Sequence, residues 1–342
     1  MERFFSFIVP VYNRPGELAE LLESMTLQNY ANFEIVIVED GSDSDLRSEK
    51  LAAKYSDRLE IEYLDLLRSG PSLARNVGTR AARGDWFLYV DSDCILPQDY
   101  LKNVNSFLEN HQVDFFGGPD RASSDFNLQQ KAISYAMTSF LTTGGIRGGK
   151  KKIDKFYPRS FNLGISRQAF YQVGGYPETR MHPGEDMVLS IELFRHGFKS
   201  GFVQDAFVYH KRRTALAKFF RQVFGFGKTR LIISKVYPET FKIFYLAPAA
   251  FLLGSVFLVA LTLIAGLWAL LPLLVWSGLV LIDATVQNKS LVTGLISVIA
   301  SFMQLYGYGY GFLSAAWTVI FLRKDKYGVL TKGFYPVRQL KN

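Results

Sequence analysis

Apolar and polar positions along the first hundred residues form a pattern that predicts strands separated by helices. Apolar runs typical of buried strands cover residues 3–11, 33–40, 59–66 and 85–93. Amphipathic or polar stretches predict helices over residues 15–28, about 43–54, 71–84 and about 97–108. Strands that alternate with helices in this way form a mostly parallel sheet that is covered on both faces. The front of the chain is therefore predicted to be an α/β domain.

Acidic side chains follow two of these predicted strands. Asp40 ends the strand over 33–40, and Asp91 and Asp93 end the strand over 85–93. In open parallel sheets, ligands bind beyond the carboxyl ends of the strands. Two aspartates one residue apart can hold a divalent ion, and the ion can hold a diphosphate. The alternative is that both aspartates only cap the next helix, although one would suffice and the cap position adjoins Pro97.

The second half of the chain contains uncharged runs long enough to cross a bilayer. Residues 243–282 are forty consecutive uncharged positions. As a helix they would be about 60 Å long, roughly twice the hydrocarbon thickness, so we expect two spans joined near residues 267–272. A second uncharged run over 290–322 is expected to form one tilted or broken span. The glycines at 307, 309 and 311 are candidates for the break.

The number of membrane spans predicted from these runs conflicts with the basic charge of the C-terminal tail. The short apolar run at the N-terminus is not typical of a signal peptide, so the front domain is expected on the cytoplasmic side. Three spans would then place the tail after residue 322 on the opposite side. That tail contains six basic residues, which favour the cytoplasm. Either the last segment is re-entrant, or one apparent span is not a span.

Charge is distributed unevenly and defines a basic segment before the apolar runs. Residues 1–210 have a balance of −5, with 23 basic and 28 acidic residues, whereas residues 211–342 have a balance of +13. Residues 210–235 contain eight Lys or Arg and no acid, with apolar residues at helical spacing. This segment either lies in the lipid headgroup layer or is an ordinary helix with a solvated basic face. The single cysteine, Cys94, excludes an intrachain disulfide and is expected to be a core residue.

Four blocks of sequence together resemble the family 2 glycosyltransferases of the A-type fold. These blocks are "FIVPVYNRPGELAELLESMTLQNYANFEIVIVEDGSDSD", "SLARNVGTRAARGDWFLYVDSD", "SFNLGISRQAFYQVGGYPE" and "GEDMVLSIELFRHG". The resemblance covers roughly residues 1–230, and the apolar segments resemble those of membrane-bound members. It implies a catalytic domain over 1–210, an interfacial segment over 211–242, transmembrane helices over 243–322 and a basic tail over 323–342.

The resemblance also implies roles for individual residues. Pro10, Val11 and Tyr12 would line a nucleoside pocket, and Asp40 would hydrogen-bond the base. Asp91 would lie near the ribose and the metal, and Asp93 would bind the metal, which would be Mg²⁺ or Mn²⁺. Arg75 would approach the nucleotide, or else be a surface residue of its helix. Asn162 and Gly164 would border the donor sugar.

Two further residues complete the implied site. Asp186 would be the base that takes a proton from the acceptor hydroxyl, and the alternative is that it only favours the N-terminus of its helix. His210 would be a further metal ligand, or else a structural histidine. A single base suffices when a metal neutralises the leaving diphosphate, and the expected stereochemical outcome is inversion.

These inferences predict a metal-dependent transferase that moves a sugar from a nucleotide donor, with UDP favoured, to a membrane-associated acceptor. A lipid-linked acceptor would suit the basic segment and Lys150–Lys152, although attraction to anionic membrane lipids explains the same lysines. The alternatives are a processive polysaccharide synthase and a membrane-anchored binding protein without catalysis. The Q-x-x-R-W motif of processive members is absent from "RQVFGFGKTR", where Gln222 is not followed by Arg-Trp. An acidic front domain argues against a nucleic-acid partner.

Overall fold

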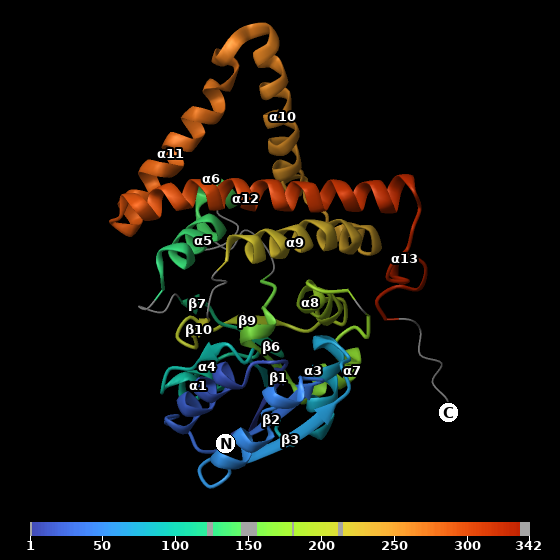
Figure 1. Ribbon diagram of the computed structural model, residues 1–342. Coiled ribbons are helices and arrows are strands. Elements are labelled where there is room, and N and C mark those ends of the chain that lie inside the picture. Colours follow the sequence, from blue (N-terminus) through green and yellow to red (C-terminus); the bar gives the residue numbers. More distant parts are fainter. Residues whose placement is uncertain (1, 122–125, 145–155, 180, 211–214, 336–342) are drawn as a thin grey trace. The chain divides into compact units, whose positions relative to one another are not determined.

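The computed structural model describes residues 2–121, 126–144, 156–179, 181–210 and 215–335 (Figure 1). The chain divides into two compact units, which are considered separately below. The first unit holds residues 1–123, 154–180 and 185–211. The second holds residues 124–153, 181–184 and 212–342. The lysines at 150–152 lie outside the described residues.

The first unit is built around a seven-stranded sheet in the order β3-β2-β1-β4-β8-β6-β9. Strands β1 to β4 are parallel to one another, while β8 runs antiparallel to both neighbours, β4 and β6. The strands are β1 (Phe5–Val11), β2 (Phe33–Asp40), β3 (Ile61–Leu66), β4 (Trp86–Tyr89), β6 (Phe115–Gly117), β8 (Leu163–Ser166) and β9 (Ser200–Phe202). The four predicted strands are thus β1 to β4, and the α/β prediction is confirmed.

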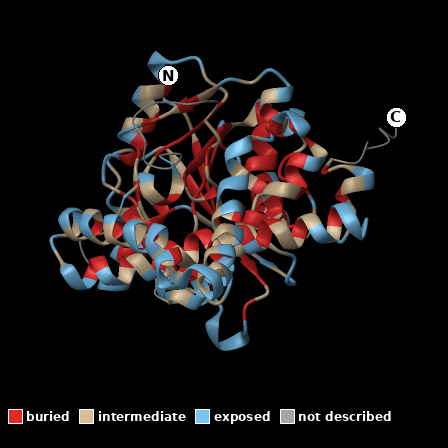
Figure 2. Cartoon of the chain, turned by 90° about the horizontal axis from the view of Figure 1, so that it is seen from above, coloured by how far each residue is buried: buried red, intermediate tan, exposed pale blue. Residues whose placement is uncertain are grey.

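Helices cover both faces of this sheet because its central strands are apolar on both sides. One buried cluster joins Phe7 and Ile37 to the helices α1 (Pro15–Thr26) and α4 (Tyr100–Asn110). The cluster on the other face joins Ile8 and Val38 to α3, α7 and α8. Figure 2 shows buried residues concentrated in the strands between these layers. The helices are α2 (Glu49–Tyr55), α3 (Pro71–Ala81), α7 (Arg167–Val173) and α8 (Glu185–Arg195).

A small second sheet of three short strands belongs to the same unit. Its order is β5 (Cys94–Ile95), β10 (Val208–His210) and β7 (Asp120–Arg121). Strand β10 pairs antiparallel with β5, and His210 lies opposite Cys94. This pairing brings a residue from the end of the catalytic-domain sequence next to the turn that follows β4.

The second unit is entirely helical among its described residues. It contains α5 (Leu128–Thr138), α6 (Phe140–Thr143), α9 (Leu216–Val236), α10 (Ala247–Ala265), α11 (Leu271–Asn288), α12 (Leu291–Ala316) and α13 (Val329–Lys332). A short turn of 3₁₀ helix, Gly266–Leu270, joins α10 to α11, so the expected pair of apolar helices forms a hairpin. A π-helical turn, Trp317–Phe321, extends α12.

The helix α12 packs side by side with α9 along glycines (Figure 1). A Cβ atom on Gly227 would lie 2.0 Å from the carbonyl oxygen of Tyr308. One on Gly311 would lie 2.0 Å from the carbonyl oxygen of Phe224. The expectation that Gly307, Gly309 and Gly311 break the last apolar segment is wrong, because α12 is continuous through Ala316. Their lack of a side chain serves the close approach of two helix backbones instead.

The expected domain limits need one amendment. Residues 124–153 belong to the helical unit, although they lie between the second and third of the four sequence blocks of the predicted catalytic domain. The reason is that α5 packs against helices of the second unit, where Ala132, Ile133 and Ala136 share a buried cluster with Phe219 and Ala300. Tyr135 on α5 also donates a hydrogen bond of 2.6 Å to Asp283 on α11.

We predict that Gly164→Ala destabilises the first unit. Gly164 lies opposite Phe116 in the register of β8 and β6, and a Cβ atom would lie 2.2 Å from the Phe116 ring. Overpacking of this kind costs about 1–3 kcal/mol. Thermal unfolding of the purified chain should show a lower midpoint than wild type. The matched control is Gly16→Ala on α1, where a Cβ atom would meet nothing within 4 Å; equal midpoints for the two variants would contradict the prediction.

Candidate functional site

The acidic groups predicted to form a site lie at one edge of the main sheet. Strand β1 pairs with β2 on one side and with β4 on the other, all in parallel. The register places Glu39 opposite Val11 and Tyr89 opposite Ile8. Asp40 and the turn that holds Asp91 and Asp93 therefore follow the carboxyl ends of strands on either side of β1. This is the edge at which open parallel sheets bind ligands.

The two aspartates of the turn after β4 have different partners. Asp91 Oδ1 accepts a hydrogen bond of 2.9 Å from the Arg75 guanidinium. Asp93 Oδ2 accepts one from Arg14 at 2.5 Å, and Asp93 Oδ1 lies 3.2 Å from His210 Nε2. A cap of the following helix needs neither arrangement, and the N-cap residue of α4 is Asp99. The alternative that both aspartates only cap this helix is therefore wrong.

The Asp93 and His210 pair suits a hard divalent cation. Asp93 Oδ1 and His210 Nδ1 are both buried without a hydrogen bond among the described residues. The His210 ring is held by stacking on Phe161, with ring centroids 4.6 Å apart. A carboxylate oxygen and an imidazole nitrogen are donors that Mn²⁺ accepts, with further positions left for oxygen ligands such as phosphate. These residues thus fit the metal that the resemblance implies.

Asp93 is ionised at neutral pH in this setting. Burial raises the pKa of Asp93, but the neighbouring His210 and Arg14 outweigh it and hold the pKa well below its usual range. Cys94 lies within 4.8 Å of the same donor atoms. Burial raises the pKa of its thiol, so it stays protonated and is a poor ligand for a hard cation. Asp91 is not part of this compact group, and its role as a metal ligand stays a prediction.

Arg75 connects the turn after β4 to the N-terminus of α8. Its side chain is 4% exposed, so the alternative of a helix-surface residue is wrong. One guanidinium nitrogen donates to Asp91, and the other donates to Glu185 Oε1 at 3.1 Å. Desolvation opposes the charge of Arg75, but the two carboxylates outweigh it and raise its pKa above the usual range. The group therefore remains a buried cation between two anions.

Asp186, the predicted base, begins the same helix as Glu185 but has a different environment. Its carboxylate is half-buried, and Oδ1 accepts a hydrogen bond of 2.7 Å from the backbone N–H of Met187. Burial raises the pKa of Asp186; the Arg159 charge opposes this shift and the Glu185 charge adds to it. A raised pKa makes a carboxylate a stronger base. Glu185 is committed to Arg75, so the two acids of the "GED" block are not interchangeable.

The predicted nucleoside pocket lies at the ends of β1 and β2. Val11 is buried, whereas the Tyr12 ring is 37% exposed and lies 4.4 Å from the Arg68 guanidinium. Asp40 accepts hydrogen bonds from Ser69 N at 2.6 Å and from Gly70 N at 3.0 Å. Asp40 thus fixes the loop before α3. Its contact with a nucleobase and the role of Pro10 in lining the pocket stay predictions.

Asn162 and Gly164 have structural contacts that account for both residues. The Asn162 amide accepts from Tyr100 Oη at 2.7 Å and donates to the carbonyl of Ala206 at 2.8 Å. Gly164 gives space to the Phe116 ring on the neighbouring strand. A border with the donor sugar remains a prediction for both.

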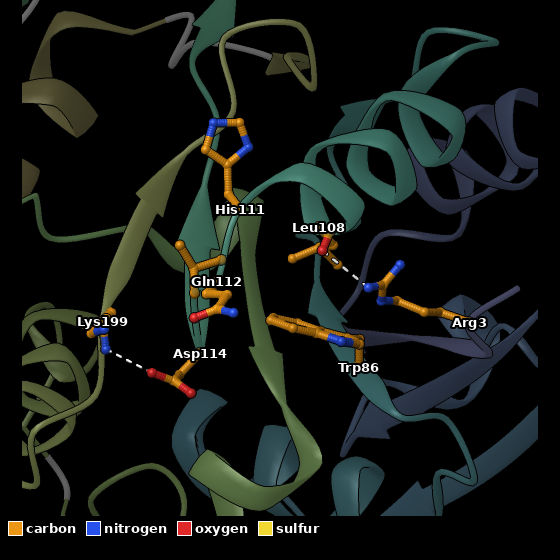
Figure 3. Close-up of a pocket in the computed structure, with 8 residues that line it drawn as sticks. Arg3, Trp86, Leu108, His111, Gln112, Asp114 and Lys199 are labelled. Atoms are coloured by element: carbon orange, nitrogen blue, oxygen red, sulfur yellow. Dashed lines mark hydrogen bonds between the residues drawn. The ribbon is translucent and has the colours of Figure 1, made fainter. Parts of the chain in front are cut away.

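A hollow of about 380 Å³ lies elsewhere in the first unit (Figure 3). Its residues include Arg3, Trp86, Asp114 and Lys199, which precede or begin β1, β4, β6 and β9. Arg3 donates to the carbonyl of Leu108 at 3.0 Å, and the Lys199 N–H donates to Asp114 at 2.8 Å. The hollow lies at the amino ends of these strands, opposite to the edge at which open parallel sheets bind ligands, and Arg3 and Asp114 already have hydrogen-bond partners within the chain. It is not a candidate for the site.

Sequence reasoning did not identify three residues that surround the site. Arg14 contacts Asp93, Arg68 covers Tyr12, and Arg159 acts on Asp186 through its charge. Arg14 lies shortly after the end of β1, and Arg68 shortly after the end of β3. Because the carboxyl ends of these strands form the predicted ligand edge, the sequence could have indicated both residues. Arg159 offers no such signal, because its proximity to Asp186 depends on the tertiary fold.

A parallel-sheet domain with an aspartate–histidine pair at its ligand edge is typical of nucleotide-diphosphate chemistry, and the comparisons agree with this class. The model of "Glycosyl transferase family 2" matches residues 6–174. The match covers just under half of the chain, most of it in the first unit, and supports a family 2 glycosyltransferase domain there. Strand β8 and helix α7 lie inside the match, while Asp186 and His210 lie beyond it.

Individual relatives share parts of the chain. An uncharacterized glycosyltransferase of Haemophilus influenzae is 35% identical over 33% of this chain and 38% of its own length. The poly(ribitol-phosphate) beta-N-acetylglucosaminyltransferase TarS of Staphylococcus aureus is 34% identical over 32% of this chain and 20% of its own length. The chain therefore matches well under half of the length of these curated relatives.

The fold is shared more widely than the sequence. The mannosyltransferase PcManGT of Pyrobaculum calidifontis, solved with GDP-Man and Mn²⁺, has a TM-score of 0.57 at 17% identity, covering 95% of this chain and 89% of that one. TarS residues 1–349 with UDP give a TM-score of 0.51 at 18% identity, covering 94% and 93%. The fold of the first unit is thus the A-type glycosyltransferase fold, followed by a helical region with apolar helices.

We predict that Asp93→Asn and His210→Gln each weaken Mn²⁺ binding by at least about tenfold, because each removes one donor of the pair. Free Mn²⁺ measured by electron paramagnetic resonance during titration of the purified full chain would report this directly. Cys94→Ser is the matched control and should bind Mn²⁺ as wild type does. Unchanged affinity in Asp93→Asn would remove the assignment.

Proposed function

We propose that this chain is an inverting, metal-dependent glycosyltransferase that moves a sugar from a UDP-sugar to a lipid-linked acceptor at the membrane. The observation that carries the proposal is the ion-paired bridge made by Arg75. It ties the turn of Asp91 and Asp93 to the helix start that bears Asp186. A site for a nucleotide diphosphate and a candidate base are thereby held on one rigid framework.

The reaction follows from the placement of the base. The acceptor hydroxyl oxygen attacks the anomeric carbon of the donor while the bond from that carbon to the diphosphate oxygen breaks. The hydroxyl proton passes to the carboxylate of Asp186, whose raised pKa favours this transfer. Attack opposite the leaving group inverts the configuration. Met187 N–H holds one carboxylate oxygen of Asp186, which leaves the other to receive the proton.

The diphosphate gains a further negative charge when its bond to the anomeric carbon breaks, so it needs positive charge near it. A divalent cation, when bound by Asp93 and His210, supplies that charge and removes the need for a second acid. Arg14 and Arg68 add fixed cations around the same edge, at Asp93 and at Tyr12 respectively. Arg75 serves the site differently, since both of its carboxylate partners already balance it.

The nature of the donor is supported by relatives rather than by the pocket itself. TarS was solved with UDP and PcManGT with GDP-Man and Mn²⁺, so both share the nucleotide-diphosphate part of the donor. A carboxylate such as Asp40 can accept a hydrogen bond from the N–H group of a nucleobase, which is compatible with uracil. A processive synthase is the second candidate, but the absent Q-x-x-R-W motif and two apolar helical segments among the described residues favour single transfer.

The first experiment measures nucleoside diphosphate release by the detergent-purified chain over a panel of UDP- and GDP-sugars, with total membrane lipid as acceptor. We expect release from one donor, its loss with EDTA, and its restoration by Mn²⁺ or Mg²⁺. Asp186→Asn should lower kcat by about 10²–10⁴-fold with little change in donor binding, because it removes only the base. Glu192→Gln, an acid farther along α8, is the matched control.

Three outcomes would count against the proposal or part of it. Release that persists in Asp186→Asn would exclude that residue as the base. A folded chain that binds no nucleotide sugar would remove the transferase assignment altogether, whereas a long product in gel filtration would favour the processive alternative.

We further propose that α10 and α11 enter the bilayer while α12 lies along its surface. Only 6% of the most apolar window over Ile243–Asn288 is buried within the structure, against 39% over Leu291–Phe321. Helices α10 and α11 are about 28 and 27 Å long, close to the hydrocarbon thickness. The turn between them exposes Leu267 and Trp268, so the hairpin is apolar to its tip.

The two faces of α12 support its surface position. Its buried face holds small and polar residues and packs on α9, which bears five basic residues and would be costly inside hydrocarbon. Its outer face is apolar. The exposed residues of α12 include Leu291, Val292, Leu295, Ile299 and Tyr310, and the π-helical turn that extends it adds Trp317, Ile320 and Phe321. With two spans, the tail and the first unit lie on one side, which resolves the conflict between span number and tail charge.

Cysteine labelling tests this arrangement, since Cys94 is fully buried and should not react. Lys289→Cys and Lys332→Cys flank α12, and both are exposed. We expect a membrane-impermeant maleimide to label both in inverted vesicles and neither in right-side-out vesicles. Trp268→Cys, at the hairpin tip, should not be labelled in inverted vesicles. Labelling of Lys289→Cys and Lys332→Cys from opposite sides would mean that α12 spans the bilayer.

A further inference from the structure

A cavity of about 470 Å³ lies within the second unit, at the end of α9. The π-helical turn after α12 and the loop that leads into α13 form its other walls. Its apolar lining comes from Ile232, Val319 and Leu330. This volume falls in the range of small-ligand sites. Neither the predicted nucleotide site nor the predicted base contributes to it.

Three lysines line the same cavity without acidic partners. Lys228, Lys324 and Lys326 form no ion pair with a described residue. The Lys228 ammonium lies 5.6 Å from the centre of the Tyr327 ring, which is its only described charge interaction. Ammonium groups gathered without counter-charges create a positive potential that attracts anions. The lining of the cavity therefore combines positive charge with apolar side chains.

Asp325 is the acid in the lining, and its contacts explain why it does not cancel this charge. Its Oδ2 accepts hydrogen bonds from Leu330 N at 2.9 Å and Thr331 N at 3.0 Å. It thereby fixes the turn that carries Lys324 and Lys326 on either side of it. One carboxylate against three ammonium groups leaves the lining with a balance of +2. Asp325 Oδ1 is buried without a hydrogen bond among the described residues, so it can accept one from a lysine that also binds a ligand.

The surroundings of the cavity are apolar and exposed. Trp317, Ile320 and Phe321 on the π-helical turn are between 52% and 69% exposed, next to the lining residues Thr318 and Val319. A free phosphate would use the lysines but neither the apolar lining nor this exposed surface. An anionic headgroup with an attached hydrocarbon chain would use all three.

We propose that this cavity binds the phosphate headgroup of a membrane lipid, a phosphomonoester or diphosphate, with its chain along the exposed face of the π-helical turn. Lys228, Lys324 and Lys326 contact the phosphate oxygens, and Ile232, Val319 and Leu330 contact the first carbons of the chain. The inference rests on the membrane position of α12 proposed above. It does not depend on transferase activity, because lipid binding is measured directly.

The test is native mass spectrometry of the full chain released from phosphatidylcholine nanodiscs that contain phosphatidic acid. The cavity variant is Lys228→Gln, Lys324→Gln and Lys326→Gln combined. The matched control is Lys218→Gln, Lys235→Gln and Lys332→Gln combined, which removes three exposed charges outside the cavity. We expect wild type and control to retain one phosphatidic acid and the cavity variant to retain about 10- to 100-fold less.

Two further arms separate the headgroup from its possible sources. Leu330→Trp keeps every charge but fills the cavity, and it should lose the retained lipid as the cavity variant does. Nanodiscs with phosphatidylglycerol at equal charge should give weaker retention, because a phosphodiester offers fewer free oxygens. Equal loss in the control variant, or full retention in Leu330→Trp, would reduce the effect to bulk attraction and overturn the proposal. Displacement of the lipid by inorganic pyrophosphate alone would overturn the lipid part of it.

Discussion

The buried guanidinium of Arg75 is the constraint on which the arrangement of the first unit depends. A cation removed from water costs several kcal/mol unless its partners are close and well oriented. Asp91 and Glu185 supply those partners from opposite sides, one from the turn after β4 and one from the start of α8. Loss of either carboxylate would leave Arg75 with one partner and break the connection on that side. The turn and the helix are therefore fixed relative to each other before any ligand binds.

This constraint also separates the tasks of four neighbouring acids. Glu185 and Asp91 balance the positive charge of Arg75. Asp186 and Asp93 have no part in that pair of ion pairs. Burial then pushes the pKa of Asp186 upward, while His210 and Arg14 hold that of Asp93 low. One carboxylate is thus suited to accept a proton and the other to remain an anion at the same pH. Such divergence between nearby carboxyl groups is typical of sites that combine a base with a metal ligand.

The sequence predicted what depends on local pattern and missed what depends on distant pairing. The pattern of apolar and polar residues predicts strands β1 to β4, and their parallel order places the acids at their carboxyl ends. The edge of the sheet that holds the candidate site was therefore predictable. The Asp93–His210 pair needs β10 to lie beside β5, so it was expected only through the family resemblance. The Arg75–Glu185 pair joins residues 110 positions apart and was missed. The sequence left open whether the apolar run over 290–322 spans the bilayer, because hydropathy counts apolar residues but not the face of the helix on which they lie. Gly307 and Gly311 face α9, and only the packing shows which side of α12 is buried and which is exposed and apolar.

Arginines and lysines have different partners in the two units. We interpret the arginines as pairing with carboxylates of this chain and the lysines as facing partners from outside it. Arginines of the first unit, such as Arg14 and Arg75, hold carboxylates of the same chain, because a planar guanidinium keeps two hydrogen bonds in fixed geometry. The lysines around the cavity near α13 have no carboxylate of the described chain to hold. An ammonium group on a flexible stem suits a partner that arrives from outside and varies in position. We therefore interpret the basic excess of the second unit as charge that attracts the lipid surface. In the first unit, by contrast, the ion pairs that stabilise it leave little unpaired charge.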